Sequence, residues 1–500
     1  MKTPNHVLRL SFLLCLFLLA LSYSPRALAQ APADSLDIFL RKKMQLLRIP
    51  GLQLAVVRQG KLVKLAQYGL ANIQDSVPVT VRTRFPINSI TKAFVGVAVM
   101  QLVEAGKLDL AAPVSRYLAG LPAAWQPVTI RQLLTHTSGL PETTPQDELE
   151  RVTEANESAC WARVLTRPLD FPIGEKFAYN QTNYILLGKI IDQLSGQPFT
   201  QFIKSRQLDV VGMPRTTSGD AHDVVPNSAR GYTFTKVVDG SFRRSNELRN
   251  VFEVYAPSHR TAAGMSSTAE ELARWVIALQ QGQLVQASSL PVLWTPGTLN
   301  NGQQRGFSQF LNGYALGWPT ITRAEHPALA PVGGGRSAVF LYPKDDLTIV
   351  VLTNLQGANP DNFVDELAAF YLPDMRASTG FGLSPTLRAL HNTLRQRGFS
   401  QAMAEVKKAK QKSPAYQLPE DEVNAWGYFL LRHAQPQNAL EIFKLNVTLY
   451  PQSANTYDSL AETYEELGNH ALARKNYQRS LELNPQNTTA AEYLKNAPRQ

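Results

Sequence analysis

The stretch Phe85-Pro86-Ile87-Asn88-Ser89-Ile90-Thr91-Lys92 precedes a mostly apolar run, residues 93–102, and the interpretation of the whole chain depends on it. Pro86 and Asn88 favour a helix start, and the apolar run predicts a helix that ends near Gly106. Free N–H groups at a helix start stabilise negative charge, and a lysine three residues after a serine shares its face. The pattern therefore predicts an activated serine nucleophile. A helix cap with a solvated lysine is the alternative.

The amino terminus has the features of a targeting segment. Lys2 and Arg9 are the charged start, residues 10–21 are an apolar run too short to span a membrane comfortably, and Ala27-Leu28-Ala29 is a small-x-small cleavage pattern. We expect residues 1–29 to be a signal peptide and the mature protein to be periplasmic or extracellular. An uncleaved anchor is the alternative.

Composition excludes several classes of function. Of the 500 residues, 44% are hydrophobic and 18% charged, which indicates a globular chain of two to four domains. Removing residues 1–29 takes away Lys2, Arg9, Arg26 and no acid, so the net charge falls from +10 to +7. This mild, dispersed excess does not indicate nucleic-acid binding. Cys160 is the one cysteine left after cleavage, so no intramolecular disulfide is expected. No second long apolar run follows, so no membrane span is expected after cleavage.

Two pairs of strand-like segments lie far apart in the sequence. The first pair consists of residues 52–58 and 61–69, which flank the tight-turn signal Gln59-Gly60. The second pair consists of residues 336–343 and 347–354. Residues 142–260 are poor in strand signals and contain an amphipathic helix at about 182–195. The pattern predicts an α/β sandwich, in which an antiparallel sheet built from both ends of the region packs with helices and a helical lobe.

Residues 415–500 are predicted to be all-α and to contain a repeat. Four positions recur after 34 residues: Gly427, Ala439, Phe443 and Pro451 correspond to Ala461, Ala473, Tyr477 and Pro485. The pattern is typical of tetratricopeptide repeats. Two repeats are fewer than independent stability requires, so we expect helices from residues 383–410 to pack on them. Such repeats would offer a surface for a protein partner, or a scaffold for the rest of the chain.

Several motifs appear in an order and spacing that resemble the serine β-lactamase-like family, in the branch of class C β-lactamases, D-alanyl-D-alanine carboxypeptidases and esterases. They are Ser89-Ile90-Thr91-Lys92, residues 133–140, Tyr179, residues 182–188, Ala262-Ala263-Gly264, residues 267–270, Tyr314 and Gly317-Trp318. The resemblance implies a hydrolase domain over residues 30–375. A helical linker, 376–414, and the repeats, 415–500, would follow it.

The resemblance also implies catalytic roles. Ser89 would attack a carbonyl and form an acyl-enzyme, Lys92 would help to take the proton, and Tyr179 would be the second base. A nearby cation lowers the pKa of a phenol, so we expect Lys92 and Tyr179 to titrate as a coupled pair. The backbone N–H groups of Ser89 and Gly335 would form the oxyanion hole. His136 is expected to have a structural role.

Two boxes depart from the family pattern. The tyrosine box ends in Gln181 in place of asparagine, which keeps the amide and moves it outward by about one methylene. The third box, which carries lysine or histidine in the family, is occupied by Val332-Gly333-Gly334, so the cation that holds a substrate carboxylate is missing. We expect the Gln181 amide to contact Lys92 or substrate, Gly333 and Gly334 to contact substrate, and Arg336 to supply the charge from a neighbouring position.

Two functions remain open at this stage. The leading hypothesis is an exported serine hydrolase that cleaves an ester or amide in a small molecule or peptide. The alternative is a catalytically inactive penicillin-binding-like fold whose repeats recruit protein partners. No metal or cofactor is implied, because no His-Glu-x-x-His or paired-cysteine spacing occurs.

Overall fold

The computed structural model describes residues 34–143, 155–238, 241–432 and 435–496. The predicted signal peptide, 1–29, lies outside these ranges. Helix α2 (Ser35–Leu47) is a unit of its own with the segment up to Ile49, and it begins where the Asp34 carboxylate accepts a hydrogen bond from the Asp37 backbone N–H. Within the described ranges, no helix has both the length and the apolar character that crossing a bilayer requires.

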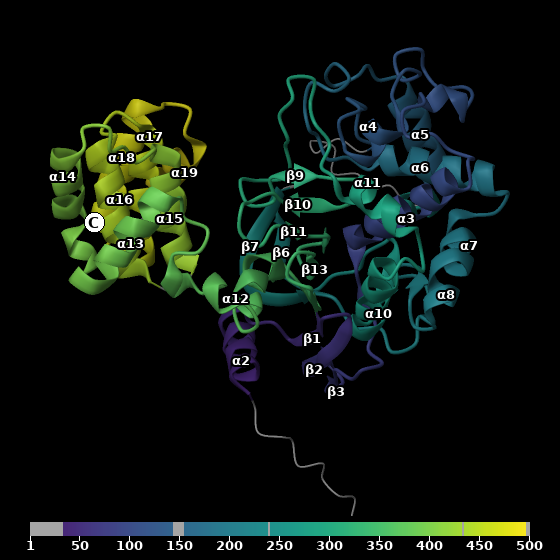
Figure 1. The fold of residues 1–500 in the computed structure, drawn as a ribbon, viewed down its shortest axis with the longest axis horizontal. Helices are drawn as coiled ribbons and strands as arrows, with labels where there is room; N and C mark the ends of the chain where they lie inside the picture. Colours follow the sequence, from purple (N-terminus) through teal and green to yellow (C-terminus); the bar gives the residue numbers. More distant parts are fainter. Residues whose placement is uncertain (1–33, 144–154, 239–240, 433–434, 497–500) are drawn as a thin grey trace, which may run out of the picture. The chain divides into compact units, whose positions relative to one another are not determined.

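An antiparallel sheet of nine strands is the centre of the α/β region (Figure 1). The strand order is β3-β2-β1-β14-β13-β11-β10-β9, and β12 pairs with β13. The bounds are β1 Gly51–Arg58, β2 Lys61–Asn72, β3 Val77–Pro78, β9 Gly313–Tyr314, β10 Pro319–Ile321, β11 Ala328–Leu329, β12 Val332–Gly333, β13 Ser337–Tyr342 and β14 Leu347–Thr353. Both predicted hairpins are present, and β1 joins them by pairing with β14. The predicted fold class is confirmed.

The turn residues explain the first hairpin of the sheet, and the burial of its central strands shows that both faces are covered. Gln59 and Gly60 both have positive φ, 51° and 68°, as the predicted two-residue hairpin turn requires. Every residue of β13 and β14 is buried, which agrees with a sheet covered on both faces. Helix α10 (Ala269–Gln280) packs on β1, β2 and β14, and the short α12 (Val364–Ala368) packs on β14.

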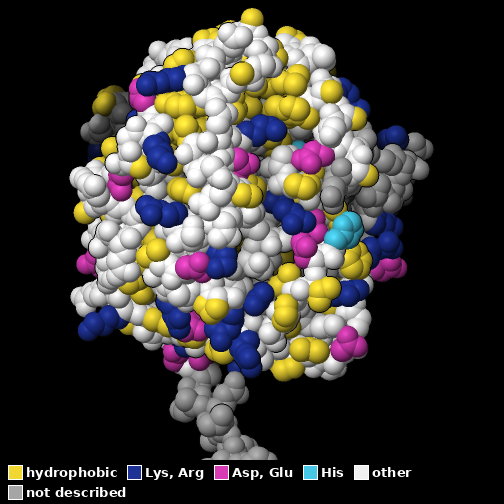
Figure 2. Space-filling view, turned by 90° about the vertical axis from the view of Figure 1, so that its right-hand side faces the viewer, with side chains coloured by type: hydrophobic (Ala, Val, Ile, Leu, Met, Phe, Trp, Pro, Cys, Tyr) yellow, Lys and Arg dark blue, Asp and Glu magenta, His cyan; other side chains and the backbone are white. Residues whose placement is uncertain are grey.

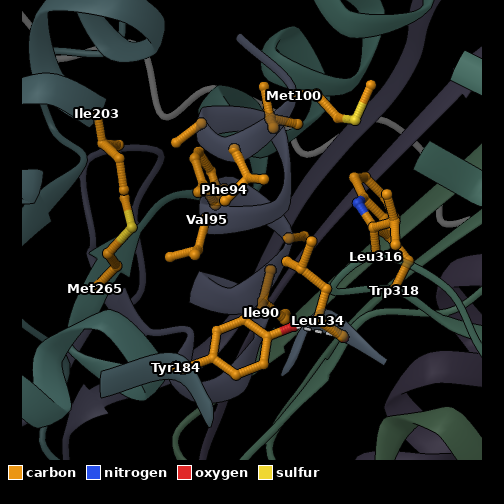
Figure 3. Close-up of a cluster of buried hydrophobic side chains, with 14 of the residues drawn as sticks. Ile90, Phe94, Val95, Met100, Leu134, Tyr184, Ile203, Met265, Leu316 and Trp318 are labelled. Atoms are coloured by element: carbon orange, nitrogen blue, oxygen red, sulfur yellow. Dashed lines mark hydrogen bonds between the residues drawn. The ribbon is translucent and has the colours of Figure 1, made fainter. Parts of the chain in front are cut away.

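Helix α3 (Thr91–Glu104) runs through the hydrophobic core. Its residues from Thr91 to Leu102 are all buried, because apolar side chains from several elements surround it (Figure 3). Phe94 stacks on Trp275 with 4.0 Å between ring centroids, and the Tyr184 hydroxyl donates a hydrogen bond to the Leu134 carbonyl below the helix. A helix that is apolar on all sides is expected only in such a position.

Shorter helices form the predicted helical lobe around α3. They are α4 Ile130–Leu134, α5 Glu157–Leu165, α6 Thr182–Ser195, α7 Phe199–Ile203, α8 Asp209–Val211, α9 Arg260–Ala263 and α11 Leu290–Trp294. The helix expected at 182–195 is therefore present. Three short strands also pair here: β4 (Phe85–Pro86) and β5 (Thr217–Ser218) flank β8 (Met265–Ser267).

One expectation for this region is wrong. Strands β6 (Tyr232–Val238) and β7 (Ser241–Asn250) form a hairpin where residues 142–260 showed little strand signal, and β15 (Leu355–Gln356) pairs with β6. The described side chains of β7 are mostly exposed and polar, so the strand carries no apolar alternation. Backbone pairing in a solvated hairpin does not require that alternation.

The carboxyl-terminal region is all-helical, as predicted. Its helices are α13 Pro385–Arg397, α14 Ala402–Lys412, α15 Glu420–Arg432, α16 Pro436–Leu449, α17 Ala454–Glu466, α18 His470–Leu483 and α19 Thr488–Asn496. One apolar cluster joins Leu387, Leu394 and Val406 to Trp426 and Phe443, so the helices of 383–410 do pack on those that follow. A Cβ on Gly427 would come within 2.4 Å of the Phe443 ring, which explains the small residue there. The assignment as tetratricopeptide repeats stays a prediction.

The surface charge is mixed. On the face shown in Figure 2, Lys and Arg side chains are distributed together with Asp and Glu side chains.

Candidate active site

The position of Ser89 is set by a short helical turn. Asn88–Ile90 form a 3₁₀ turn that leads directly into α3, so Ser89 lies at the amino end of the helix, as predicted. The pairing of β4 with β8, together with the hydrogen bond from Ile87 N to Met265 O, holds this turn against the Ala262 segment. Asn88 has a φ of 47°, a left-handed conformation that is uncommon outside glycine and is tolerated best by asparagine and aspartate. The turn presents a half-buried serine where helix N–H groups favour negative charge.

Lys92 reaches Ser89 from inside the core. Its side chain is 0% exposed, and its Nζ lies 3.5 Å from Ser89 Oγ. Nζ also donates hydrogen bonds of 2.9 Å to Gln181 Oε1 and to the Ala262 carbonyl. Burial lowers the pKa of Lys92 to about 7, because removal from water disfavours the ammonium form. A substantial fraction of Lys92 is therefore neutral near pH 7 and able to accept a proton.

Tyr179 lies beside the same pair. Its hydroxyl hydrogen-bonds with Ser89, and Lys92 Nζ stands 4.6 Å from the centre of its ring. The expectation that the phenol has a lowered pKa is wrong. Burial raises the pKa of Tyr179 well above its usual value, and the Ser89 hydrogen bond opposes this only in part. Tyr179 is therefore a neutral phenol at pH 7, suited to donating or relaying a proton.

Gln181 lies where the departure from the family pattern predicted an amide contact. Its Oε1 accepts the hydrogen bond from Lys92 Nζ, so the longer side chain reaches the lysine. Gln181 immediately precedes α6, whose first residue is Thr182. The tyrosine box and the Ser-x-x-Lys box therefore meet at the lysine.

The glycine segment of the third box lies against the backbone of Ser89. A Cβ on Gly333 would come within 2.0 Å of the Ile87 carbonyl oxygen and 3.1 Å of the Ser89 backbone nitrogen. Gly334 and Gly335 have positive φ, 57° and 61°, which closes the tight turn between β12 and β13. Only glycine lets the two backbones approach so closely. Val332, at the start of β12, is half-buried and supplies no charge.

Arg336 does not replace the missing third-box cation, because its guanidinium is buried and ion-paired. Its side chain is 1% exposed, and Nη2 donates a 3.0 Å hydrogen bond to Glu253 Oε1 in an ion pair. The other oxygen of Glu253 accepts a 2.8 Å hydrogen bond from Asn88 Nδ2, which also donates to the Tyr255 hydroxyl. The Arg336 charge is therefore neutralised by a carboxylate, and the pair supports the turn before Ser89.

His136 has the packing expected of a structural residue. The ring is fully buried, and its Nδ1 lies 3.3 Å from the Asn180 backbone nitrogen and 3.0 Å from Asn183 Nδ2. Its ring centroid lies 4.3 Å from that of Tyr179. Burial, and secondarily Lys92, lowers the pKa of His136 well below its usual value, so the ring is neutral. The His136 ring packs against the ring of Tyr179 and helps to hold it in place.

Glu142 is a charged group of the site that the sequence did not reveal. Its Oε2 accepts a 2.9 Å hydrogen bond from the Gln181 backbone, and its Oε1 accepts bonds from the Thr143 N–H and hydroxyl. Burial raises the pKa of Glu142, and the hydrogen bonds and Lys92 oppose this rise. Its negative charge raises the pKa of Lys92 in return. No motif marks this glutamate, and only its closeness to residues 133–140 could have suggested it.

Replacing Glu142 by glutamine should shift any hydrolysis that depends on Lys92 to lower pH. Without the carboxylate the pKa of Lys92 falls from its value of about 7, so the neutral amine persists at lower pH and the acid limb of kcat/KM moves down the pH scale. His136 and His259, which also face Lys92, have lowered pKa values, chiefly through burial, and stay neutral there. The check is a pH profile of ester hydrolysis.

Glu157→Gln is the matched control for this measurement. Glu157 accepts a hydrogen bond from Ser258 N and interacts with His259, with no direct contact to Lys92 in the described structure. Its acid limb should coincide with that of the unmodified protein. If the acid limb of kcat/KM in Glu142→Gln stays where it is in the unmodified protein, the electrostatic coupling between Glu142 and Lys92 is contradicted.

The described residues contain no group of three or more His, Cys, Asp or Glu side chains placed to hold a metal ion. The one cysteine they include, Cys160, is free and buried.

The fold and the cluster at Ser89 define a β-lactamase/transpeptidase-like protein. Residues 36–372 match the family described as Beta-lactamase, and the chain belongs to this family.

Named relatives extend the comparison. Protein flp of Staphylococcus aureus strain MW2 is 28% identical over 361 residues, which cover 69% of this chain and 68% of the relative. The putative penicillin-binding protein PbpX of Bacillus subtilis is 27% identical over 253 residues, 49% of this chain and 58% of the relative. The family is thus that of β-lactamases and penicillin-binding proteins.

Solved structures share the fold. The octameric penicillin-binding protein homologue from Pyrococcus abyssi superposes with a TM-score of 0.58 at 25% identity, over 68% of this chain and 77% of that one. The D-amino acid amidase from Ochrobactrum anthropi SV3 gives a TM-score of 0.57 at 21% identity, over 67% of this chain and 100% of that one. At this identity the amidase shows the fold alone.

Proposed function

We propose that this protein is an exported serine hydrolase that cleaves an ester or amide through an acyl-Ser89 intermediate. The observation that carries the proposal is the buried Lys92, with a pKa of about 7 and its Nζ 3.5 Å from Ser89 Oγ. A lysine that served only as a structural cation would gain from staying charged. Burial against Ser89 instead favours the neutral, proton-accepting form. Export is supported by the pattern of residues 1–29.

The first step forms the acyl-enzyme. Neutral Lys92 takes the proton of Ser89 as Oγ bonds to the substrate carbonyl carbon, and the carbonyl oxygen becomes an oxyanion. The N–H groups of Ser89 and Gly335 are the proposed donors to that oxyanion, because Gly333 brings the two backbones together. The carbon–leaving-group bond then breaks, and the leaving group takes a proton through the Tyr179 hydroxyl, which Lys92 re-protonates.

The second step releases the acid. A water molecule attacks the acyl carbon, passes its proton to the Lys92–Tyr179 pair, and the bond to Ser89 Oγ breaks as Oγ regains a proton. Tyr179 stays a neutral phenol between transfers, because burial raises its pKa. Gln181 and the Ala262 carbonyl hold Nζ in place throughout.

The site favours substrates without a carboxylate next to the scissile bond. Val332 replaces the cation of the third box, Arg336 is paired with Glu253, and Glu142 adds a negative charge. Holding a substrate carboxylate requires a free cation, which these residues do not provide. Esterase or peptidase chemistry on an uncharged group therefore fits better than β-lactam hydrolysis. Recruitment of a protein partner by the helical repeats stays a prediction.

Pre-steady-state hydrolysis of p-nitrophenyl acetate tests the proposal. We expect p-nitrophenol release above the rate with a heat-unfolded sample, with a burst that approaches one equivalent when deacylation is the slower step. A catalytically inactive binding module would release p-nitrophenol no faster than the unfolded sample. That outcome would support the alternative function and contradict the hydrolase.

A further inference from the structure

An aromatic surface continues outward from the catalytic tyrosine. We call Phe177, Tyr179, Phe307 and Tyr314 the aromatic wall. The Phe307 ring centroid lies 4.9 Å from that of Tyr179 and 5.8 Å from those of Phe177 and Tyr314. Tyr314 is buried, Phe177 and Tyr179 are half-buried, and Phe307 is 43% exposed. The wall thus begins at the hydroxyl beside Ser89 and ends at the surface.

Phe307 is held in this position by an ordered turn. Ser308 N donates to the Leu311 carbonyl, and Leu311 N donates back to Ser308 Oγ. A Cβ on Gly306 would come within 2.2 Å of the Leu311 carbonyl oxygen, so the residue before the phenylalanine must be small. Single exposed apolar side chains are common and carry no meaning alone. Phe307 differs because a closed turn fixes it against the ring of Tyr179.

The charged residues around Ser89 indicate which substrate groups the aromatic wall can bind. Lys92 is buried and bonded to Gln181, Arg336 is paired with Glu253, and Val332 is apolar. Lys92, Arg336 and Val332 therefore offer no free cation to an anionic substrate group. Ligand sites that combine an apolar wall with few polar groups take apolar ligands.

We infer that the aromatic wall is the specificity subsite of the hydrolase and that it holds an uncharged aromatic or bulky apolar group attached to the scissile ester or amide. The inference rests on the proposed function and names the substrate class of the same site. Offset or edge-to-face stacking on Phe307 and Tyr179 would provide the contact.

Thioesters test the inference, because their leaving group need not be aromatic. We would compare S-ethyl thioacetate, S-ethyl phenylthioacetate, S-benzyl thioacetate and S-ethyl thiosuccinate, with thiol release as the readout. At least one aromatic substrate should exceed the thioacetate about tenfold in kcat/KM, an effect of the size of aromatic stacking and burial. The thiosuccinate should be the poorest. The preferred aromatic substrate shows which side of the bond the wall holds.

Phe307→Ala should remove that preference, lowering kcat/KM about tenfold for the aromatic substrate and less than twofold for S-ethyl thioacetate. Phe310→Ala is the matched control, because Phe310 lies in the same loop and stacks on Phe340 at 6.4 Å. It should leave the preference intact.

The outcomes separate the two claims. Turnover of the thioacetate without preference for either aromatic substrate, or an equal loss on all substrates in Phe307→Ala, would overturn the subsite and leave the hydrolase standing. No turnover of any thioester would contradict both.

Discussion

Ser89→Ala is expected to reduce ester hydrolysis by about 10³-fold or more, because the variant lacks the hydroxyl that is proposed to carry the acyl group. The remaining side chains near the carbonyl are a buried lysine, a phenol and an amide, which position or move protons. The loss should appear in kcat as well as in kcat/KM, since the covalent bond exists only along the reaction path. Steady-state hydrolysis of p-nitrophenyl acetate measures both.

The fold should survive this change. Ser89 is half-buried in a turn whose backbone is held by β4 and β8, so the loss of one hydroxyl leaves the core intact. Ser288→Ala, at an exposed residue, is the control and should keep full activity. Retention of more than about a tenth of the rate in a folded Ser89→Ala variant would contradict the nucleophile assignment.

Lys92→Met is expected to reduce kcat/KM by about 10²- to 10⁴-fold, the usual contribution of a positioned general base. Methionine has a similar length and no amine, so Ser89 keeps its place and loses its proton acceptor. The residual activity should lose the acid limb near pH 7, because that limb reports the Lys92 amine. A pH–rate profile of kcat/KM measures both effects.

Thermal unfolding controls for damage to the core. Methionine leaves Gln181 Oε1 and the Ala262 carbonyl without their donor, which costs about 1–3 kcal/mol for each unsatisfied group. Removal of a buried ionisable group offsets part of this cost. A folded variant that keeps the wild-type rate and the same acid limb would show that another group takes the Ser89 proton.

The sheet was predictable because its signals are local. The Gln59-Gly60 turn and the apolar run 347–354 indicate hairpins without any knowledge of the tertiary structure. The hairpin of β6 and β7 was missed for the opposite reason. The exposed polar side chains of β7 have no alternating apolar pattern, and the parallel pairing of Leu355 with Tyr232 of β6 joins residues 123 positions apart. Such pairing is a property of the assembled fold.

Some features of the candidate site could likewise be predicted from the sequence, and others could not. Spacing alone places Ser89 and Lys92 on one helix face, and the Gln181 contact followed from the tyrosine box. The protonation states did not follow, because they depend on burial. Lys92 titrates near neutral pH and Tyr179 does not, because burial lowers the pKa of the amine and raises that of the phenol. The pairing of Arg336 was also hidden, since Glu253 lies 83 residues away in the sequence.

The site of covalent labelling shows whether Ser89 is the nucleophile. Protein that lacks residues 1–29 is incubated with a fluorophosphonate, and in parallel with a fluorescent penicillin, then digested and mapped by mass spectrometry. We expect one fluorophosphonate adduct, on the peptide that contains Ser89, absent from Ser89→Ala and slow to form in Lys92→Met. Penicillin labelling should be weaker, because Val332 offers no cation. An adduct that persists in folded Ser89→Ala, or no adduct with either reagent, would contradict the acyl-serine mechanism.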